Sequence, residues 1–519
     1  MITKSDYEII RHLGAFFPHF GIYKRKCDFT NKDIISVFSK KSAYPVWHKD
    51  EWFEKANPPS AIYKKDVDFW QQVWGLFKTC PIAHNIGIGN ENSEYTDDCW
   101  YSKNCYLCHS LGWSQDSAYS FRIIRNTDCM FCVFSFDLQK CYDVIYGFDS
   151  YNIKYAIDIK RCKNSAFLFD CQDCEDCFLC YNLRNKKFCI GNKQYSKQDY
   201  EKEISKYNLS SRKQYNELKQ SFLKYITNNA WWKNLQINSV ENGEGNYLDN
   251  CKDVKNCYLA ELLEDCENAA RSISTKKSKY IISAFDAENI YMTALAQVQC
   301  YNISYSFNVT ESKNLEYCGN CFRCEDCFLC CGLVGKKYHI LNKEYSKQDY
   351  EKLKAEISID MKQKGIYGEF FPAYFSPSSY EETMSGVLCS LDLETQKKLG
   401  FNVFEHEKSN KDDFKDISEL PDDICDTVDF DFKGGYYDDE AKRPFQISDL
   451  DITFSKKLGV PLNDKFYIRR LKENFSWMFP EIQLRETKCA KSGKIIKTAL
   501  PVKLDGRILS IEEYEKVIY

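Results

Sequence analysis

Small, apolar and polar positions recur with a period of twelve residues between residues 90 and 180. Stepping back from CEDCFLC (174–180), related segments begin at residues 162, 150, 138, 126, 114, 102 and 90, with no insertion. The third position is Asn or Asp in every segment except the one that contains Lys140. The fourth and, after the first segment, the seventh positions are small or apolar, and an aromatic ring usually stands between them. A repeat this short cannot bury a face alone, so neighbouring copies must stack.

This pattern predicts a β-solenoid. Asn and Asp suit the corners of the coil, because their side chains hydrogen-bond to nearby backbone and they tolerate left-handed conformations. The small residues after each corner suit a narrow interior in which side chains stack in rows. The segments at 102, 126 and 174 all carry Cys at positions four and seven, which favours a coil of two segments, 24 residues, over a coil of 12.

The whole block recurs at an offset of 150 residues. VKNCYLA (254–260), CYNISYS (300–306) and a second CEDCFLC (324–330) repeat earlier segments, while the units near 276 and 287 slip by one or two residues. Both blocks end in nearly identical segments, NKQYSKQDYEK (192–202) and NKEYSKQDYEK (342–352). Ser196 with Asp199, and Ser346 with Asp349, are typical helix starts. A helix there would cover the open end of each stack, where strand edges are otherwise exposed.

The sequence therefore predicts a mainly β protein with two tandem β-solenoid (β-helix) blocks, helical caps and small α+β modules at its ends. The expected divisions are a degenerate zinc-ribbon-like module (1–88), the first block (89–195), a helical cap and bridge (196–241), the second block (242–345), a helical cap and extension (346–404), an acidic linker (405–442) and a second degenerate zinc-ribbon-like module (443–519).

The two ends resemble each other. IYKRKCDFTNKDIISVF (22–38) parallels LRETKCAKSGKIIKTAL (484–500), each with a Cys, a short turn and a β-run. This is the shape of a zinc-ribbon knuckle, but a structural zinc needs four N or S ligands. Cys27 and Cys489 have no neighbouring cysteine, so both modules are interpreted as metal-free remnants.

Composition limits the class of protein. With 519 residues, 44% hydrophobic and 28% charged, the chain is long enough for several domains with buried cores. A formal charge of −4 gives no overall basic footprint. The N-terminus lacks the pattern of a signal peptide and no apolar run is long enough to cross a bilayer, so we expect no membrane association and a cytoplasmic location, or virion and host cytoplasm for a viral protein. In that reducing compartment most of the 27 cysteines pack as small hydrophobes.

Two runs of cysteines spaced by three are the main candidates for chemistry. They comprise Cys171, Cys174, Cys177 and Cys180 in the first block and Cys321, Cys324, Cys327 and Cys330 in the second. Such runs resemble the ligands of zinc or an iron–sulfur cluster. Against this, the same repeat positions hold Ser, Ile, Ala or Leu in other segments, and residues three apart on a strand point to opposite faces. We therefore favour structural packing, with metal binding as the alternative.

Other sites are weakly indicated. The seven histidines include no pair with metal-ligand spacing, and no phosphate-binding loop or nucleophile elbow is present. His339 stands in the second block where Cys189 stands in the first, a faint indication of a metal. Basic residues form small clusters, such as Lys24–Lys26 and Arg469–Arg470, which are interpreted as solvated surface, with nucleic-acid contact as the alternative.

The chain resembles an uncharacterised family of Cys-rich proteins, flanked by zinc ribbons, from reduced-genome bacteria and large DNA viruses, whose automated label is sometimes CaiB/BaiF family. The resemblance runs nearly end to end, through YKRKCDFTNKDIIS, YPVW, the NCY and CFLC segments, GEFFPAYFSPSSYEET (368–383) and EEYEKVIY at the C-terminus. Relatives typically carry CxxC pairs at both ends, which this chain lacks. The resemblance implies a fold and no activity, and nothing in the motifs supports the CoA-transferase that the label suggests.

We accordingly expect a non-enzymatic structural scaffold or macromolecule-binding protein with no cofactor. Extended solenoid faces suit docking of macromolecules, so a protein partner or self-assembly is the expected mode of action. The alternative is a metal-binding (zinc or iron–sulfur) or nucleic-acid-binding module that uses the cysteine runs or the terminal modules.

Overall fold

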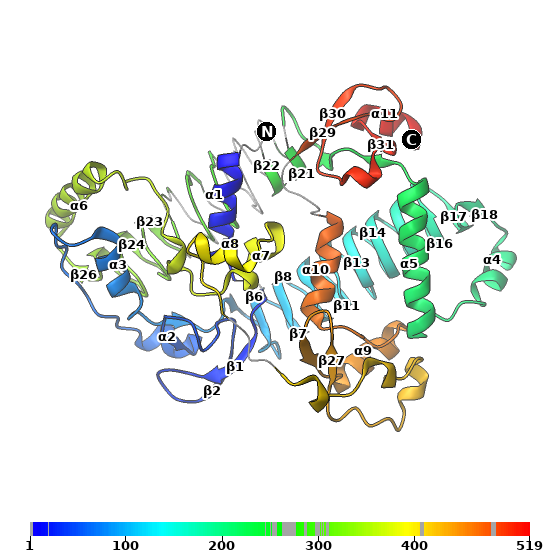
Figure 1. Cartoon of the computed structure of the whole chain (residues 1–519), viewed down its shortest axis with the longest axis horizontal. Helices are drawn as coiled ribbons and strands as arrows, with labels where there is room; N and C mark the ends of the chain where they lie inside the picture. Colours follow the sequence, from blue (N-terminus) through cyan, green and yellow to red (C-terminus); the bar gives the residue numbers. More distant parts are fainter. Residues whose placement is uncertain are drawn as a thin grey trace. The chain divides into compact units, whose positions relative to one another are not determined.

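A computed structural model describes residues 4–18, 20–243, 245–249, 251, 257–261, 277–284, 288–295, 302, 304, 306–307, 311–404, 409–478 and 484–519 (Figure 1). The chain divides into two units. Unit 1 consists of residues 1–86, 235–404 and 481–485, and unit 2 of residues 87–234, 405–480 and 486–519. The protein is mainly β, with a large and almost entirely parallel sheet, which confirms the coarse fold class predicted from the sequence.

The sheet of unit 2 has 14 strands and contains the whole first repeat block. Its strands are β5 (Gly87–Ile88), β6 (Thr96–Trp100), β7 (Lys103–Tyr106), β8 (Cys108–Gly112), β9 (Gln115–Ala118), β10 (Phe121–Ile124), β11 (Thr127–Met130), β12 (Val133–Phe136), β13 (Tyr142–Phe148), β14 (Tyr151–Lys160), β15 (Lys163–Gln172), β16 (Glu175–Tyr181), β17 (Lys187–Ile190) and β18 (Lys193–Gln194). All pairs are parallel except β17 with β18.

Parallel partners in this sheet are offset by twelve residues. Ile153 lies opposite Ser165, and Ala156 lies opposite Leu168. The same offset joins β6 to β8 and β16 to β17. The preference for a 24-residue coil is therefore wrong: each twelve-residue segment pairs with the next. Similarity between alternate segments reflects which side chains fill the positions and not the length of the coil.

The backbone of unit 2 turns at every third residue. From Asp98 to Phe188, each third residue has a φ between 47° and 61°, in the left-handed region. The Asn and Asp of the repeat occupy one such position per segment, as predicted, but Tyr, Phe, Leu, Trp and Arg occupy others. None of these residues is β-branched, which fits the steric penalty of Val, Ile and Thr in this conformation. Each segment of twelve residues therefore contains four such turns.

The residue after each turn points inward. From Cys99 to Cys180 every residue at this inward position is buried, and the set consists of Cys, Ser, Ala, Gly, Val, Leu, Ile and Asn. The cysteines and aliphatic side chains among them form one continuous core cluster. No aromatic or charged side chain stands at these positions, which fits a narrow, close-packed interior.

Helices of unit 2 cover outer faces of the sheet (Figure 1). They are α4 (Lys197–Ile204), α5 (Arg212–Asn229), α9 (Asp449–Leu458) and α10 (Tyr467–Met478), whereas α11 (Ile511–Ile518) packs on the separate pair of β19 (Trp232–Lys233) and β31 (Ile508–Leu509). α5 packs on β15, α9 on β11, α10 on β12 and β13, and α4 on β17. Ser196 caps α4 through the backbone N–H of Asp199, which confirms the predicted helix start after the last segment.

Unit 1 contains the described part of the second block. Its strands β20 (Ile237–Asn238), β21 (Gly245–Asp249) and β22 (Cys257–Glu261) form one parallel sheet. β23 (Lys313–Glu316), β24 (Glu325–Phe328), β25 (Lys337–Ile340) and β26 (Lys343–Glu344) form another, with the same offset of twelve residues between parallel partners. The segments matched at 254 and 300, and the slips near 276 and 287, lie wholly or partly outside the described residues.

The remaining elements of unit 1 are short. They are α1 (Lys4–Gly14), β1 (Tyr23–Lys26), β2 (Asp33–Ser36), β3 (Val46–Trp47), α2 (Lys49–Lys55), α3 (Phe69–Phe77), β4 (Ile82–Ala83), α6 (Lys347–Gln363), α7 (Met384–Leu388) and α8 (Leu393–Lys398), with 3-10 turns at Ala373–Phe375 and Tyr380–Glu382. Ser346 caps α6 through Asp349, again as predicted. In the part of the chain described, no helix has the length and apolar character needed to span a bilayer.

The two terminal modules repeat one local structure. Each has an antiparallel hairpin, β1–β2 or β29 (Arg485–Lys488) with β30 (Ile495–Thr498), followed by a short strand, β3 or β31 (Ile508–Leu509), and a helix. β31 pairs with β19 (Trp232–Lys233). The Cys27 N–H donates to Lys32 and the Cys489 N–H to Lys494, both at 2.8–2.9 Å. The parallel between residues 22–38 and 484–500 is thus one of structure as well as of sequence.

Residues 409–442 are not a simple exposed linker. They contain 3-10 turns at Lys411–Asp413, Ile417–Glu419 and Ile424–Thr427, and β27 (Tyr436–Asp438) pairs with β28 (Arg443–Phe445). Leu420, Ile424 and Tyr436 are buried in a core cluster of their own. The prediction of an exposed linker is wrong because the few apolar side chains of this segment still pack together, although most of its acidic side chains are exposed and only Asp438 among them is buried.

Candidate functional site

The predicted metal-ligand cysteines all lie at inward positions. Cys171, Cys174, Cys177 and Cys180 belong to the core cluster of unit 2, and Cys321, Cys324, Cys327 and Cys330 to that of unit 1. Each is at most 2% exposed. The expectation that cysteines three apart face opposite ways is wrong, because the turn before each cysteine directs every one of them into the interior. Each run is therefore a group of four inward thiols from neighbouring sides of one segment, and its stacked neighbours lie twelve residues away.

These thiols have protein partners. The Cys171 Sγ lies 3.4 Å from the carbonyl oxygen of Phe169, two residues before it, and 3.8 Å from that of Cys180, nine residues after it. Inward serines repeat this pattern: the Ser114 hydroxyl donates to Gly112 at 3.2 Å and to Ile123 at 3.3 Å. Cys and Ser are interchangeable here because both are small and both donate to the carbonyl groups at the turns.

Sulfur atoms also neighbour one another. Hydrogen bonds from the thiols of Cys162, Cys171 and Cys177 lower the pKa of Cys174, and the shared protons raise the pKa of Cys162. Within the part of the chain that the structure describes, no group of three His, Cys, Asp or Glu side chains is placed to hold a metal ion. His339 lies opposite Cys327, the register position that Cys189 holds opposite Cys177. Its Nδ1 contacts the Lys337 carbonyl at 2.7 Å, so the histidine reproduces the contact of the thiol.

The terminal cysteines differ from the inward ones. Burial would raise the pKa of Cys489, but hydrogen bonds from Ser492, Ser510 and Lys491 lower it to about 7. The Ser510 N–H lies 3.4 Å from its sulfur, as the His48 N–H lies 3.3 Å from the sulfur of Cys27. Backbone N–H groups aimed at sulfur are the local geometry of a zinc knuckle, here with one cysteine in each module.

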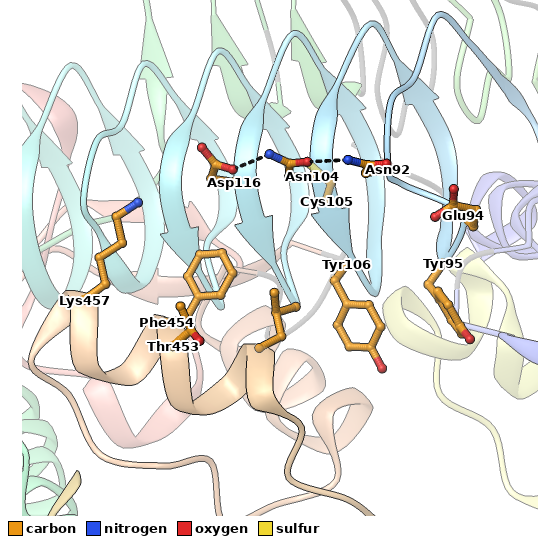
Figure 2. A pocket seen from close by; sticks show the side chains of 11 residues that line it. Asn92, Glu94, Tyr95, Asn104, Cys105, Tyr106, Asp116, Thr453, Phe454 and Lys457 are labelled. Atoms are coloured by element: carbon orange, nitrogen blue, oxygen red, sulfur yellow. Dashed lines mark hydrogen bonds between the residues drawn. The ribbon is translucent and has the colours of Figure 1, made fainter. Parts of the chain in front are cut away.

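A cavity of about 410 Å³ lies between the sheet of unit 2 and α9 (Figure 2). The sheet and the segment before it contribute a polar row and two tyrosines, and α9 contributes a mostly apolar wall. The lining residues are Asn92, Glu94, Tyr95, Asn104, Cys105, Tyr106, Asp116, Leu450, Thr453, Phe454 and Lys457. This cavity was not predicted from the sequence.

The polar row is a ladder of side chains from three successive segments. Asn92 Nδ2 donates to Asn104 Oδ1 at 3.1 Å, and Asn104 Nδ2 donates to Asp116 Oδ1 at 2.8 Å (Figure 2). All three are the Asn or Asp of the repeat, held in the left-handed conformation. Because both amides donate towards Asp116, the Asn92 carbonyl oxygen is left as an acceptor at the other end, near Glu94.

The aromatic part consists of Tyr95 and Tyr106. Their ring centroids are 5.3 Å apart and their planes are tilted by 53°. Tyr95 is 40% exposed and Tyr106 is half-buried. Burial raises the pKa of Tyr106, and the charge of Asp451 adds to this, so its phenol stays protonated at physiological pH.

The position of α9 is fixed by its N-terminus. Ser448 and Asp451 form a capping box, and Asp451 is 2% exposed. Burial raises the pKa of Asp451, against hydrogen bonds from Ser448 and from Tyr119 on the sheet. At the C-terminus, Lys457 forms an ion pair with Asp128. α9 is thus attached to the sheet at both ends, which keeps the cavity open between them.

The groups in the cavity are poor catalysts. Burial raises the pKa of the Cys105 thiol well above its usual range, so the thiol is neutral. Its Sγ lies 3.4 Å from the Lys103 carbonyl oxygen. Asp116 accepts hydrogen bonds from Asn104 and Gln115, and Lys457 is committed to Asp128. The thiol is thus not a nucleophile at neutral pH, and Asp116 and Lys457 are already engaged.

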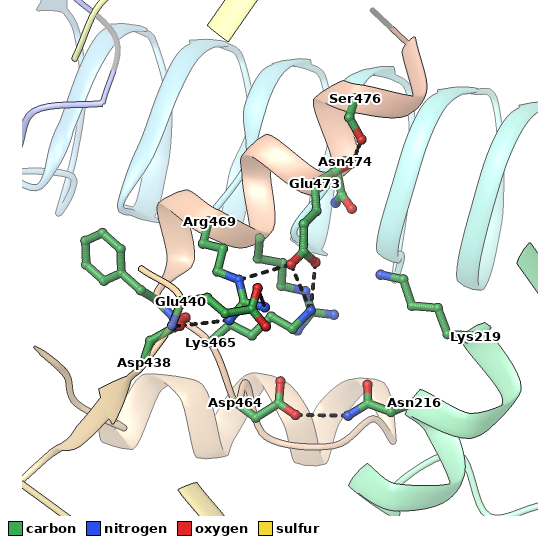
Figure 3. Close-up of polar contacts among 12 residues, drawn as sticks. Asn216, Lys219, Asp438, Glu440, Asp464, Lys465, Arg469, Glu473, Asn474 and Ser476 are labelled. Atoms are coloured by element: carbon green, nitrogen blue, oxygen red, sulfur yellow. Dashed lines mark hydrogen bonds and ion pairs between the residues drawn. The ribbon is translucent and has the colours of Figure 1, made fainter. Parts of the chain in front are cut away.

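A second polar cluster fastens α5 and α10 to the sheet; Figure 3 shows two of its members, Lys219 on α5 and Asn474 on α10. Asp143, fully buried, lies 2.7 Å from Lys219 of α5, 3.1 Å from Arg470 and 2.8 Å from Asn474 of α10. Burial would raise the pKa of Asp143, but Lys219 and Arg470 outweigh it and hold the pKa below its usual range. On the outer side of α10, Arg469 pairs with Asp438 and Glu440. This cluster is structural: each charge is used to hold a helix.

No protein-family model matches this chain, and no curated protein is significantly similar to it.

Proposed function

We propose that the protein is a non-enzymatic binding protein built on a rigid β-solenoid, with the cavity beside α9 as its binding site. The solenoid is supported by the offset of twelve residues between parallel partners and by the turn at every third residue. A stack in which each segment is hydrogen-bonded to both neighbours is stiff, and its side faces present fixed rows of side chains. We place it in the reducing cytoplasm, since the cysteines of the first block are thiols buried in the core.

The observation that carries this proposal is the cavity itself. It presents a fixed ladder of hydrogen-bonding groups beside two aromatic rings, while its thiol is neutral and its lysine is paired. Concave sites with a few placed polar groups and aromatic walls are typical of small-ligand binding.

Affinity selection tests the proposal. The purified full chain is incubated with a metabolite mixture, and retained compounds are identified by mass spectrometry before and after prolonged incubation. We expect an unaltered compound that wild-type protein retains and Tyr106→Ala does not. A compound consumed in proportion to protein concentration, with a new product, would contradict a purely binding role.

The alternative is a metal-binding protein that uses the two runs of cysteines spaced by three, and one observation favours it. The thiols around Cys174 are close enough to share protons, as sulfur ligands of a cluster would be. Elemental analysis of anaerobically purified protein tests this: less than one metal ion per chain removes the alternative. A nucleic-acid-binding role for the terminal modules has no comparable support.

A further inference from the structure

The cavity beside α9 carries uncompensated negative charge. Glu94 and Asp116 both line it, and neither has an ion-pair partner in the part of the chain that the structure describes. The one lysine of the lining, Lys457, is already neutralised by Asp128, which is itself only 10% exposed. The lining as a whole is therefore acidic, and a ligand that enters it must supply the missing positive charge.

The hydrogen-bonding groups have the same preference. The Asn92 amide donates to Asn104, and the Asn104 amide donates to Asp116. What remains at its ends are acceptors: the Asn92 carbonyl oxygen with the Glu94 carboxylate on one side, and the Asp116 carboxylate on the other. A ligand with several N–H donors matches this arrangement, whereas a phosphate or a carboxylate would be repelled by the carboxylates of Glu94 and Asp116.

The aromatic rings complete the selection. Tyr95 and Tyr106 are tilted by 53° at 5.3 Å, and the Phe454 ring faces the same cavity from α9 (Figure 2). The faces of such rings attract cations within about 6 Å, and aromatic walls beside carboxylates are the usual receptor for alkylammonium groups. A neutral sugar would also stack on these rings, but it would leave two carboxylates without a counter-charge.

A metal ion fits the cavity less well. Among the described residues no three His, Cys, Asp or Glu side chains are placed to coordinate one ion. The nearest thiol, Cys105, is neutral and donates to a backbone carbonyl. The aromatic rings and the volume of about 410 Å³ suit an organic cation better than a metal ion.

We propose that the cavity binds an alkylammonium ligand, with positive charge at the Glu94 end or the Asp116 end of the ladder, or at both, and its carbon chain against Tyr95 and Tyr106. This inference rests on the proposed binding function and names the class of its ligand. The group has two natural sources, a free polyamine or a lysine side chain of a peptide, and the experiment below separates them.

Titration calorimetry with the full chain at low ionic strength uses three probes: spermidine, a capped peptide with three lysines, and cellobiose as a neutral ring-stacking control. We expect saturable binding of spermidine or of the peptide at one site per chain, and no binding of cellobiose. If spermidine alone binds, the source is a polyamine; if the peptide binds more tightly, the source is a protein partner. Acetylation of the peptide lysines should abolish its binding.

Variants then locate the site. Glu94→Gln and Asp116→Asn keep the shape of the cavity and should each weaken binding about three- to tenfold, and Tyr106→Ala about tenfold. Tyr106→Phe should retain binding, because the ring face is kept. Asp326→Asn is the matched control: Asp326 also accepts an amide hydrogen bond across twelve residues, from Asn314 at 2.9 Å, but does not line the cavity. Its variant should bind as wild type does.

Three outcomes would overturn the inference: neither cation binds, Asp326→Asn weakens binding as much as Asp116→Asn, or cellobiose binds in preference to both cations. In the third case, with binding lost in Tyr106→Ala, the proposed binding function stands and only the ligand class is wrong. Thermal unfolding of each variant, unchanged by more than a few degrees, confirms that a lost signal is not a loss of fold.

Discussion

The Lys219 Nζ lies 2.7 Å from Oδ2 of Asp143, a carboxylate with no exposed surface. Arg470 reaches the same carboxylate from another helix. The buried carboxylate of Asp143 on the sheet thus forms ion pairs with both α5 and α10. These ion pairs hold the two helices against the sheet.

Asp143→Asn should therefore destabilise the protein strongly. Removing one partner of a buried charge cluster leaves Lys219 and Arg470 uncompensated, which costs about 3–5 kcal/mol. Asp137→Asn is the control, because Asp137 is also left-handed but pairs with Arg125 on the surface, where the loss is at most about 1 kcal/mol. Urea unfolding of both variants measures the difference. Equal costs would show that the buried cluster contributes no more than a surface pair.

Low pH should remove the contribution of the Asp143 ion pairs to the free energy of unfolding. The pKa of Asp143 is lower in the folded protein than in the unfolded chain, so its contribution to stability is present above the unfolded pKa of about 4. It is lost progressively as pH falls below that value and towards the folded pKa. We expect the gap in unfolding free energy between wild type and Asp143→Asn to narrow from pH 7 to pH 3. A gap that stays constant would mean that the variant acts through packing.

At the inward cysteine positions, substitution by serine should be tolerated and substitution by a large side chain should destabilise the fold. Cys171→Ser keeps a small donor that reaches the same carbonyl groups and should cost little, whereas Cys171→Phe overpacks a closed interior by about 1–3 kcal/mol or more. Thermal unfolding of the two variants under reducing conditions tests this. A collapse of Cys171→Ser, together with loss of bound zinc or iron, would instead support the metal alternative.

At residues with a left-handed backbone, a β-branched substitution should destabilise the protein more than a glycine substitution does. Asn164 is exposed and has a φ of 47°. Asn164→Gly should be near neutral, since glycine adopts this conformation freely, and Asn164→Val should cost about 1–2 kcal/mol from steric strain. Both variants lose the hydrogen bond from Asn152, so the comparison isolates the backbone. Equal unfolding midpoints would contradict the assigned conformation.

Much of the fold was accessible from the sequence because the repeat is local. The period of twelve, the Asn and Asp turns and the helices after Ser196 and Ser346 follow from short-range signals. The sequence suggests the wrong coil length, because the other turns are made by residues such as Tyr155 and Phe167. Tyr and Phe are not residue types that indicate a left-handed backbone. Without those turns, the cysteines seemed to alternate between faces.

The cavity could not be predicted for a different reason. Asn92, Asn104 and Asp116 were recognised as turn residues, but their use as a polar wall depends on α9, which lies more than 300 residues further along the chain. Tyr95 and Tyr106 were recognised as aromatic positions of the repeat. Only the folded chain brings Phe454 and Lys457 opposite them.

The turn at every third residue has a consequence for how such a protein can change in length. Side chains that stack on one another, inward or outward, are twelve residues apart in the sequence. A single inserted residue would therefore move all later thiols out of the interior and place tyrosines and arginines in it. Gain or loss of one whole segment leaves every column in place. The block can therefore lengthen or shorten in whole segments, and the distance along the stack between two bound groups changes in equal steps.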